Sequence, residues 1–172
     1  MGSKAKILYR KKTRELLFRI IFQMTISGDF TEKAKDAFLA DTSLYIGDVD
    51  ENIPIGCIFD RERGETPDLN YLNFAFLCVS DNIGDIDKIL AGASEKWSIG
   101  RMSNTDLAIL RLAAAEILYI DTIDDATSIA EAVVMAKKYG TENSPAFVNG
   151  ILGTVARSKT GDEPVKTVGG SS

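Results

Sequence analysis

The stretch LAILRLAAAEIL, residues 107–118, decides the fold, because it is apolar on nearly every side of the helix that it predicts. A helix of this kind lies at the centre of a protein, with other helices around it. Arg111 and Glu116 are its charged residues, and we expect both to be buried or half-buried. Ser103 and Asp106 precede it and are typical of a helix start, where a hydroxyl caps the first amides and an acid lies near the positive end of the helix dipole.

Segments on both sides of this stretch also show helical periodicity and are bounded by capping or turn residues such as Ser27-Gly28-Asp29 and Ser144-Pro145. The predicted helices span residues 10–26, 31–44, 68–79, 83–97, 103–120, 124–139 and 144–157. No convincing pair of strands emerges, although IPIGCIF, residues 53–59, could form a short extended piece. The sequence therefore predicts an all-α fold of about seven helices in antiparallel bundles.

Three further expectations concern the organisation of the chain. We expect a flexible basic arm over residues 1–9, a helical domain over 10–157 and a disordered tail over 158–172, whose composition offers almost nothing apolar to bury. Residues 47–67, rich in glycine, proline and acids, predict a long loop. Within the helices, Leu17, Ile20, Ile21 and Met24 form a stripe that should be buried, as should Trp97 at the end of the fourth helix.

Composition excludes much enzymology. The chain contains no histidine, the usual general base and the commonest zinc ligand. Its 45% hydrophobic content suits a buried core, and no apolar run is long enough to span a bilayer, so we expect a soluble, cytoplasmic protein. Cys57 and Cys78 have no paired spacing and predict free thiols. No catalytic residue, metal ligand or cofactor site is predicted.

The charge is unevenly distributed and indicates an anionic partner. The net charge is -5, yet residues 1–19 carry seven cations and the single acid Glu15, so this end has a charge of +6 and the remainder -11. Clustered lysine and arginine attract phosphates largely without regard to base sequence. We expect Arg10, Lys11 and Arg14 to project outward from the first helical turns. The alternative is a solvated terminus without a partner, and the two interpretations are about equally favoured by this feature alone.

Residues 137–147, KKYGTENSPAF, form a second candidate site at a helix-turn-helix junction. The turn brings Tyr139 and Phe147 near exposed amides, where aromatic rings could stack bases and polar groups could bond their edges. A structural interpretation competes well, because Gly140 is suited to end a helix and the aromatic residues could belong to the core. The acids of residues 48–68 lack the spacing of a calcium loop. Asp106 and Glu116 are each expected to pair with Arg111.

Two blocks carry a resemblance to a known family. EKWSIGRMSNTDLAILRLAAAEIL, residues 95–118, and EAVVMAKKYGTENSPAFVNGIL, residues 131–152, resemble the NusB family and occur in the same order. RKKTRELLFRIIFQM, residues 10–24, resembles the arginine-rich opening and first helix of that family, and SGD at 27–29 follows. Together these blocks cover about half of the chain.

The resemblance implies two packed three-helix bundles with one extra helix, and a non-catalytic transcription antitermination factor. NusB proteins bind the boxA segment of nascent ribosomal RNA leaders as a heterodimer with NusE, a small-subunit ribosomal protein, and help assemble an antitermination complex on RNA polymerase. Some self-associate, so a homodimer is also implied as an option. The RNA-binding residues that carry over to this chain come from the first helix and the last turn: Arg10, Lys11, Lys12, Arg14, Tyr139, Asn143 and Phe147.

The chain departs from the family pattern at several positions. Asn143 stands where many members have Asp, so an amide that can donate hydrogen bonds replaces a carboxylate that repels phosphate, and we expect RNA binding to be kept or strengthened. Pro145-Ala146 lacks a lysine found in many members, and Ala115 stands where tyrosine is usual. The arm contains more lysine than the family's arginine-rich pattern, with less bidentate phosphate geometry.

Two alternatives remain at this point. The same fold could serve as a protein-binding scaffold without sequence-specific RNA binding, in which case the basic arm is incidental. NusB-like domains also occur fused to ribosomal RNA cytosine methyltransferases, but this sequence has no glycine-rich methyl-donor motif, so only a detached fragment would fit.

Overall fold

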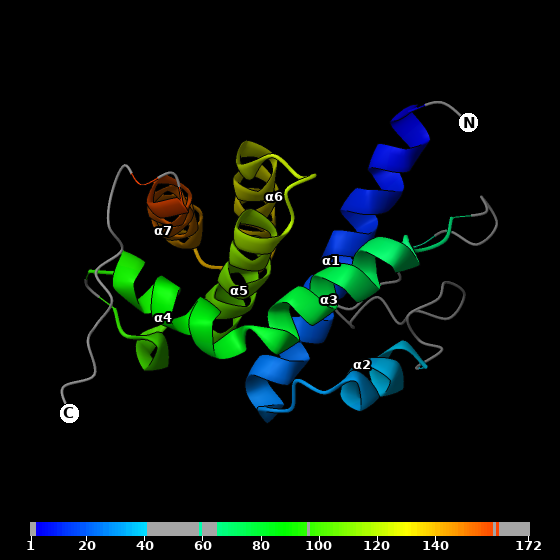
Figure 1. Cartoon of the computed structure of the whole chain (residues 1–172), viewed down its shortest axis with the longest axis horizontal. Helices are drawn as coiled ribbons and strands as arrows, with labels where there is room; N and C mark the ends of the chain where they lie inside the picture. The colour runs from blue at the N-terminus through cyan, green and yellow to red at the C-terminus, as the bar shows by residue number, and fades with distance from the viewer. Residues whose placement is uncertain (1–2, 41–58, 60–64, 96, 160, 162–172) are drawn as a thin grey trace. The chain divides into compact units, whose positions relative to one another are not determined.

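Seven α-helices and one short 3₁₀-helix make up the regular structure of the described residues, which are 3–40, 59, 65–95, 97–159 and 161 in this computed structural model (Figure 1). The elements in chain order are α1 (Ser3–Ser27), α2 (Glu32–Leu39), α3 (Leu69–Asp81), α4 (Ile83–Ala93), η2 (Ile99–Arg101), α5 (Asn104–Tyr119), α6 (Asp125–Tyr139) and α7 (Ser144–Lys159). None of these residues forms a β-strand. The predicted all-α fold is confirmed.

The chain divides into two compact units, Met1–Phe74 and Ala75–Ser172, and α3 begins in the first and ends in the second. In the first unit, the predicted stripe of α1 is confirmed, because Leu17, Ile20, Ile21 and Met24 are all buried. The helix ends at Ser27 and is followed by Gly28, whose φ of 77° is a left-handed conformation that glycine adopts without strain. Thr31 then caps α2 by accepting a hydrogen bond from the Ala34 amide.

In the second unit, α5 is the central helix and contacts α4, α6 and α7. Every residue from Leu107 to Ile117 is buried, as its nearly uniform apolar sequence predicts. The predicted cap is also confirmed, since Ser103 Oγ accepts a hydrogen bond from the Asp106 amide. Around α5, the helices α6 and α7 also pack against each other, which completes a three-helix bundle to which α4 adds.

The charged residues of α5 are buried as predicted, at 8% exposure for Arg111 and 0% for Glu116. The predicted partner for Asp106 is wrong, however. The Arg111 guanidinium donates to both carboxylate oxygens of Asp87 on α4, at 2.9 and 2.8 Å. This two-point pair satisfies the buried cation and joins α4 to the central helix. Asp106 lies at the start of α5, where one of its carboxylate oxygens accepts no hydrogen bond from the described residues.

Three helix limits differ by several residues from the sequence prediction. α2 ends at Leu39 and not near residue 44, with Ala40 as its C-cap. α1 begins at Ser3 and not at Arg10, because the preceding residues include the strong helix formers Ala, Lys and Leu. α4 ends at Ala93, so Trp97 lies outside it and is 48% exposed, not buried. Glycines at 92 and 100 and the competing Ser103 cap favour a break here. The limits of the predicted arm, domain and tail stay predictions.

Some expectations fall on residues that the structure does not describe. Cys57, most of the predicted loop over 47–67, and most of the predicted tail over 158–172 lie outside the described residues. The other cysteine, Cys78, is a free thiol on α3. Burial raises the pKa of the Cys78 thiol, and the nearby Asp81 charge adds to this shift.

Candidate nucleic-acid interface

The basic residues predicted to bind RNA in the first unit are Arg10, Lys11, Lys12 and Arg14, which we call the α1 basic cluster. Arg10 Nε and Nη2 donate to Asp68 Oδ2 at 3.1 and 3.0 Å, and Lys12 pairs with Glu65. Arg14 is only 4% exposed. The expectation that Arg10 and Arg14 project outward is therefore wrong, because an acid and aromatic surface of the same unit hold them. Lys12 is held by Glu65 in a similar way.

The aromatic surface that holds Arg10 and Arg14 is the ring of Tyr71 on α3. The guanidinium carbons of Arg10 and Arg14 lie 4.5 and 5.5 Å from the centre of its ring, within the range of cation–π attraction. Asp68 fixes the start of α3 in the same place, since its Oδ1 accepts from the Tyr71 amide and its own amide donates to Thr13 Oγ1. The cluster is therefore an organised ion-pair network.

The second predicted site is the turn between α6 and α7. The Thr141 amide donates to Ser144 Oγ at 2.9 Å, and the Phe147 amide donates to the Asn143 carbonyl at 3.2 Å, which starts α7. Glycine is needed at position 140 because a side chain does not fit there. Its backbone is not left-handed, since φ is -90°. A Cβ atom there would lie 2.7 Å from the Ala136 carbonyl oxygen and closer still to the Ser144 side chain.

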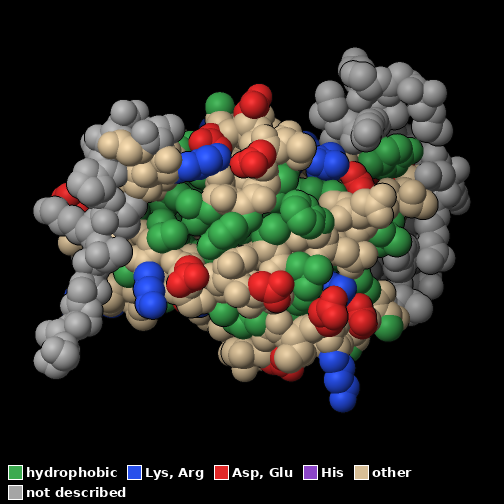
Figure 2. Space-filling view, viewed as in Figure 1, with side chains coloured by type: hydrophobic (Ala, Val, Ile, Leu, Met, Phe, Trp, Pro, Cys, Tyr) green, Lys and Arg blue, Asp and Glu red, His purple; other side chains and the backbone are tan. Residues whose placement is uncertain are grey.

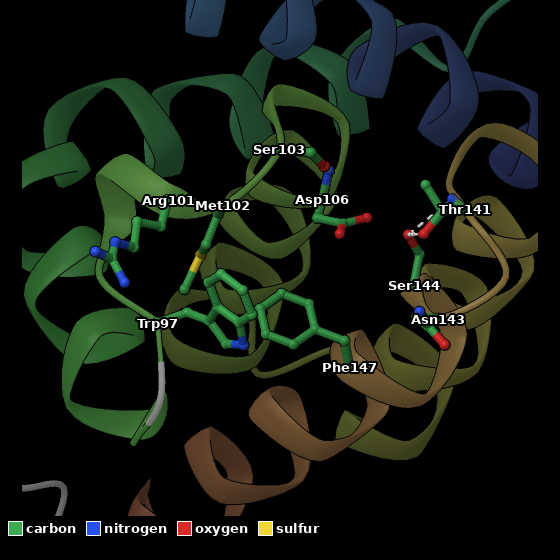
Figure 3. A pocket seen from close by; sticks show the side chains of 9 residues that line it. All are labelled: Trp97, Arg101, Met102, Ser103, Asp106, Thr141, Asn143, Ser144 and Phe147. Atoms are coloured by element: carbon green, nitrogen blue, oxygen red, sulfur yellow. Dashed lines mark hydrogen bonds between the residues drawn. The ribbon is translucent and has the colours of Figure 1, made fainter.

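A pocket of about 210 Å³ opens beside this turn (Figure 3). We call it the Trp97–Phe147 pocket. Its lining residues come from the α4–α5 connection, the first turn of α5 and the α6–α7 turn: Trp97, Arg101, Met102, Ser103, Asp106, Thr141, Asn143, Ser144 and Phe147. Figure 3 shows the Trp97 and Phe147 rings on the same side of the pocket, beside Met102. The structure thus brings together Asn143 and Phe147 of the predicted set.

The pocket has two kinds of charged surface, one that attracts anionic groups and one that accepts hydrogen bonds from a ligand. The first turns of α5 and α7 both border it, and helix N-termini attract anions. Arg101 adds an exposed cation at its edge. Asp106 supplies the opposite charge, and its Oδ1 is buried without a hydrogen-bond partner among the described residues.

Tyr139 does not line the pocket. It ends α6 and is half-buried, with Lys138 Nζ 5.4 Å from the centre of its ring. The sequence also failed to single out Trp97 and Arg101 as site residues, because the apolar spacing of residues 83–97 placed Trp97 on a buried helix face. The Gly100 and Ser103 break before α5 was the signal that could have placed both residues in an exposed connection.

Neither a metal centre nor a membrane-spanning helix occurs within the part of the chain that the structure describes. No group of histidine, cysteine, aspartate and glutamate side chains there could hold a metal ion. No described helix has the length and apolar character needed to cross a membrane.

This chain is similar to a known family and to individual proteins described as members of it. The NusB family matches residues 11–157. A relative from Clostridium novyi, described as transcription antitermination protein NusB, is 33% identical over 150 residues, which are 87% of this chain and 98% of the relative. A relative of the same description from Lachnoclostridium phytofermentans is 38% identical over 147 residues, 85% of this chain and 97% of the relative.

Solved structures give the same picture. NusB from T. maritima superposes with a TM-score of 0.65 at 30% identity, covering 86% of this chain and 90% of the other. A chain from a crystal structure of the antitermination factors NusB and NusE in complex with double-stranded RNA gives a TM-score of 0.65, covering 87% and 97% of the two chains. At 20% identity, that second likeness shows the fold alone.

Proposed function

Because the chain belongs to the NusB family, we propose that it is a non-catalytic, RNA-binding transcription antitermination factor. The observation that carries this proposal is the Trp97–Phe147 pocket. It places an exposed amide, Asn143, and a half-buried ring, Phe147, beside two helix N-termini, which is a surface suited to bases and phosphates. Both residues come from the block over residues 131–152 that resembles the family.

The α1 basic cluster supplies the second contact with RNA. Its cations are held by Asp68 and Glu65 in the free protein, so RNA phosphates have to compete with carboxylates for Arg10 and Lys12. Lys11 is exposed and is the member of the cluster best placed to meet a phosphate first. Binding through this cluster is therefore salt-sensitive.

The partners we propose are a boxA-like single-stranded RNA, NusE and, through them, the antitermination complex on RNA polymerase. The support for NusE is that a structural neighbour has been solved together with NusE and RNA. The support for antitermination is that the relatives carry that description. Self-association as a homodimer remains a prediction of the family resemblance.

A protein-binding scaffold is the second candidate, and exposed hydrophobic side chains favour it. Figure 2 shows hydrophobic side chains at the surface, among acidic and basic ones. On α3, Leu69 and Phe74 are 53% and 54% exposed, so both side chains are available to a partner protein. This surface is compatible with RNA binding elsewhere on the chain.

Titration of a boxA-like single-stranded RNA, with and without NusE, tests the proposal. We expect salt-sensitive binding that Phe147→Ala weakens roughly tenfold, because an aromatic ring that stacks a base contributes about 1–3 kcal/mol. Val134→Ala on α6, also an exposed apolar position, is the matched control and should bind as the wild type does. Absence of binding at about 50 mM salt would exclude RNA binding and leave the scaffold.

A further inference from the structure

The Trp97–Phe147 pocket has the size and walls of a site for one nucleobase. Its volume of about 210 Å³ lies below the roughly 300–1,000 Å³ of pockets for drug-sized ligands. Trp97 and Phe147 give it aromatic surface, and Trp97 is 48% exposed although tryptophan is normally well buried. Exposed aromatic rings beside a cavity are the feature on which unstacked RNA bases pack.

One polar group in the pocket lacks a partner. Asp106 Oδ1 is buried and accepts no hydrogen bond from the described residues, although its own amide is satisfied by Ser103. Figure 3 shows the Asp106 carboxylate directed toward Thr141 and Ser144, above the two aromatic rings. An unsatisfied buried acceptor is costly, so a small rotation that turns Oδ1 into the pocket is favoured when a ligand there donates a hydrogen bond to it.

The identity of the base follows from the donors that each base offers. A carboxylate only accepts hydrogen bonds, and its two oxygens suit two adjacent N–H donors. Guanine offers this pair on its Watson–Crick edge, N1–H beside the N2 amino group. Adenine and cytosine offer one amino group next to an acceptor nitrogen, and uracil offers one N–H between two carbonyl oxygens, so each of them sets an acceptor against the carboxylate.

We propose that the Trp97–Phe147 pocket binds a single guanine of single-stranded RNA, packed against Trp97 and Phe147 and read by Asp106. The proposal rests on the proposed RNA-binding function and deepens it. Arg101 and the N-termini of α5 and α7 border the pocket, where they attract the phosphates that flank the base. Asn143 also lines the pocket and can bond a second polar edge of the base.

The test uses four RNA heptamers with the full chain at low salt. Each heptamer is uridine throughout except at the centre, which is guanosine, inosine, adenosine or uridine. Their equal charge keeps the phosphate contribution constant. Inosine keeps N1–H and lacks the N2 amino group, so it removes one of the two donors without changing the protein. Trp97 is the only tryptophan in the chain, so its fluorescence reports directly on the pocket.

We expect the guanosine heptamer to bind roughly tenfold more tightly than the inosine heptamer, the effect of one hydrogen bond to a charged group. The adenosine and uridine heptamers should bind no more tightly than inosine. Only guanosine should change the Trp97 emission strongly. Asp106→Asn should reduce the preference for guanosine over inosine below about twofold. Asp121→Asn, an exposed position after α5, makes the same charge change and should keep the preference.

The outcomes separate this proposal from the proposed function. Equal binding of all four heptamers keeps RNA binding and overturns the guanine site, and it leaves the pocket to another class of ligand such as an apolar side chain of a partner protein. A guanosine preference that survives Asp106→Asn also overturns it. If no heptamer binds, both proposals fail. The inosine comparison needs only the wild type, so it can overturn the guanine site even if a variant is unstable.

Discussion

The α1 basic cluster and the Trp97–Phe147 pocket are both candidate RNA-binding regions, but their charges are arranged in opposite ways. In the cluster, Arg10 and Lys12 already have acid partners, and Arg14 is buried beside Tyr71. In the pocket, a carboxylate oxygen of Asp106 has no partner among the described residues, and Trp97 is exposed.

The difference shows that a high density of cations in the sequence does not mean that those cations are available to a ligand in the folded protein. The cluster stands out in the sequence, yet phosphate has to exchange with carboxylates there before a cation is gained. The pocket carries little charge in the sequence, but its aromatic surface and its helix N-termini need no rearrangement of an ion pair. We therefore expect the cluster to contribute mainly salt-dependent affinity, and the pocket to contribute base preference.

The largest expected effect comes from Gly140→Ala, which disrupts the turn beside the Trp97–Phe147 pocket and leaves the α1 basic cluster intact. The added Cβ would overlap the Ala136 carbonyl and the Ser144 side chain, so we expect about 3 kcal/mol of destabilisation in urea unfolding. Gly150→Ala on α7 is the control. Its Cβ would meet nothing within 4 Å, and replacing a helical glycine should stabilise the protein by about 0.5–1 kcal/mol. Equal effects of the two substitutions would contradict the close packing of the turn.

A smaller effect is expected from Asp68→Asn, which releases Arg10 on the cluster side. The amide oxygen of asparagine can still accept from the Tyr71 amide and start α3, whereas the charge that holds Arg10 is lost. We expect RNA to bind roughly threefold more tightly, because a carboxylate that competes with phosphate for this cation is removed. Asp36→Asn, an exposed acid on α2, should leave the affinity unchanged. Weaker RNA binding by Asp68→Asn would mean that the ion pair organises the cluster for RNA instead of competing with it.

The smallest effect belongs to Lys11→Ala. If Lys11 meets one phosphate, its loss should lower the slope of log affinity against log salt by about 0.7, with only a small loss of affinity at moderate salt. Lys33→Ala, an exposed lysine on α2, is the control and should keep the slope. Filter binding across a salt series measures both. An unchanged slope for Lys11→Ala would remove Lys11 from the interface.

Sequence patterns predicted the helices well where one strong periodic signal dominated. The uniformly apolar α5, the stripe on α1 and the Ser103 cap are local properties of neighbouring residues, so the sequence contains them directly. The end of α4 was missed because Trp97 continues the apolar spacing, although the last residue of the helix is Ala93. The spacing of apolar residues does not reveal where the backbone hydrogen bonds of a helix end.

The candidate site was only partly predictable for a related reason. Asn143 and Phe147 could be named from the turn and from the family resemblance. Asp68 and Glu65 could not be matched with Arg10 and Lys12, because these pairs join residues more than fifty positions apart. Trp97 and Asp106 likewise meet the α6–α7 turn only in the folded unit. Such long-range proximity depends on packing, which local composition does not determine.

Photocrosslinking of a boxA-like single-stranded RNA to the wild-type chain, followed by mass spectrometry of the linked peptides, tests most directly whether RNA contacts both regions. We expect crosslinks around Lys11 on α1 and around Trp97 and Phe147 at the pocket, with the first set fading as salt rises. Crosslinks confined to other surfaces, such as Leu69 and Phe74 on α3, would contradict this two-region interface.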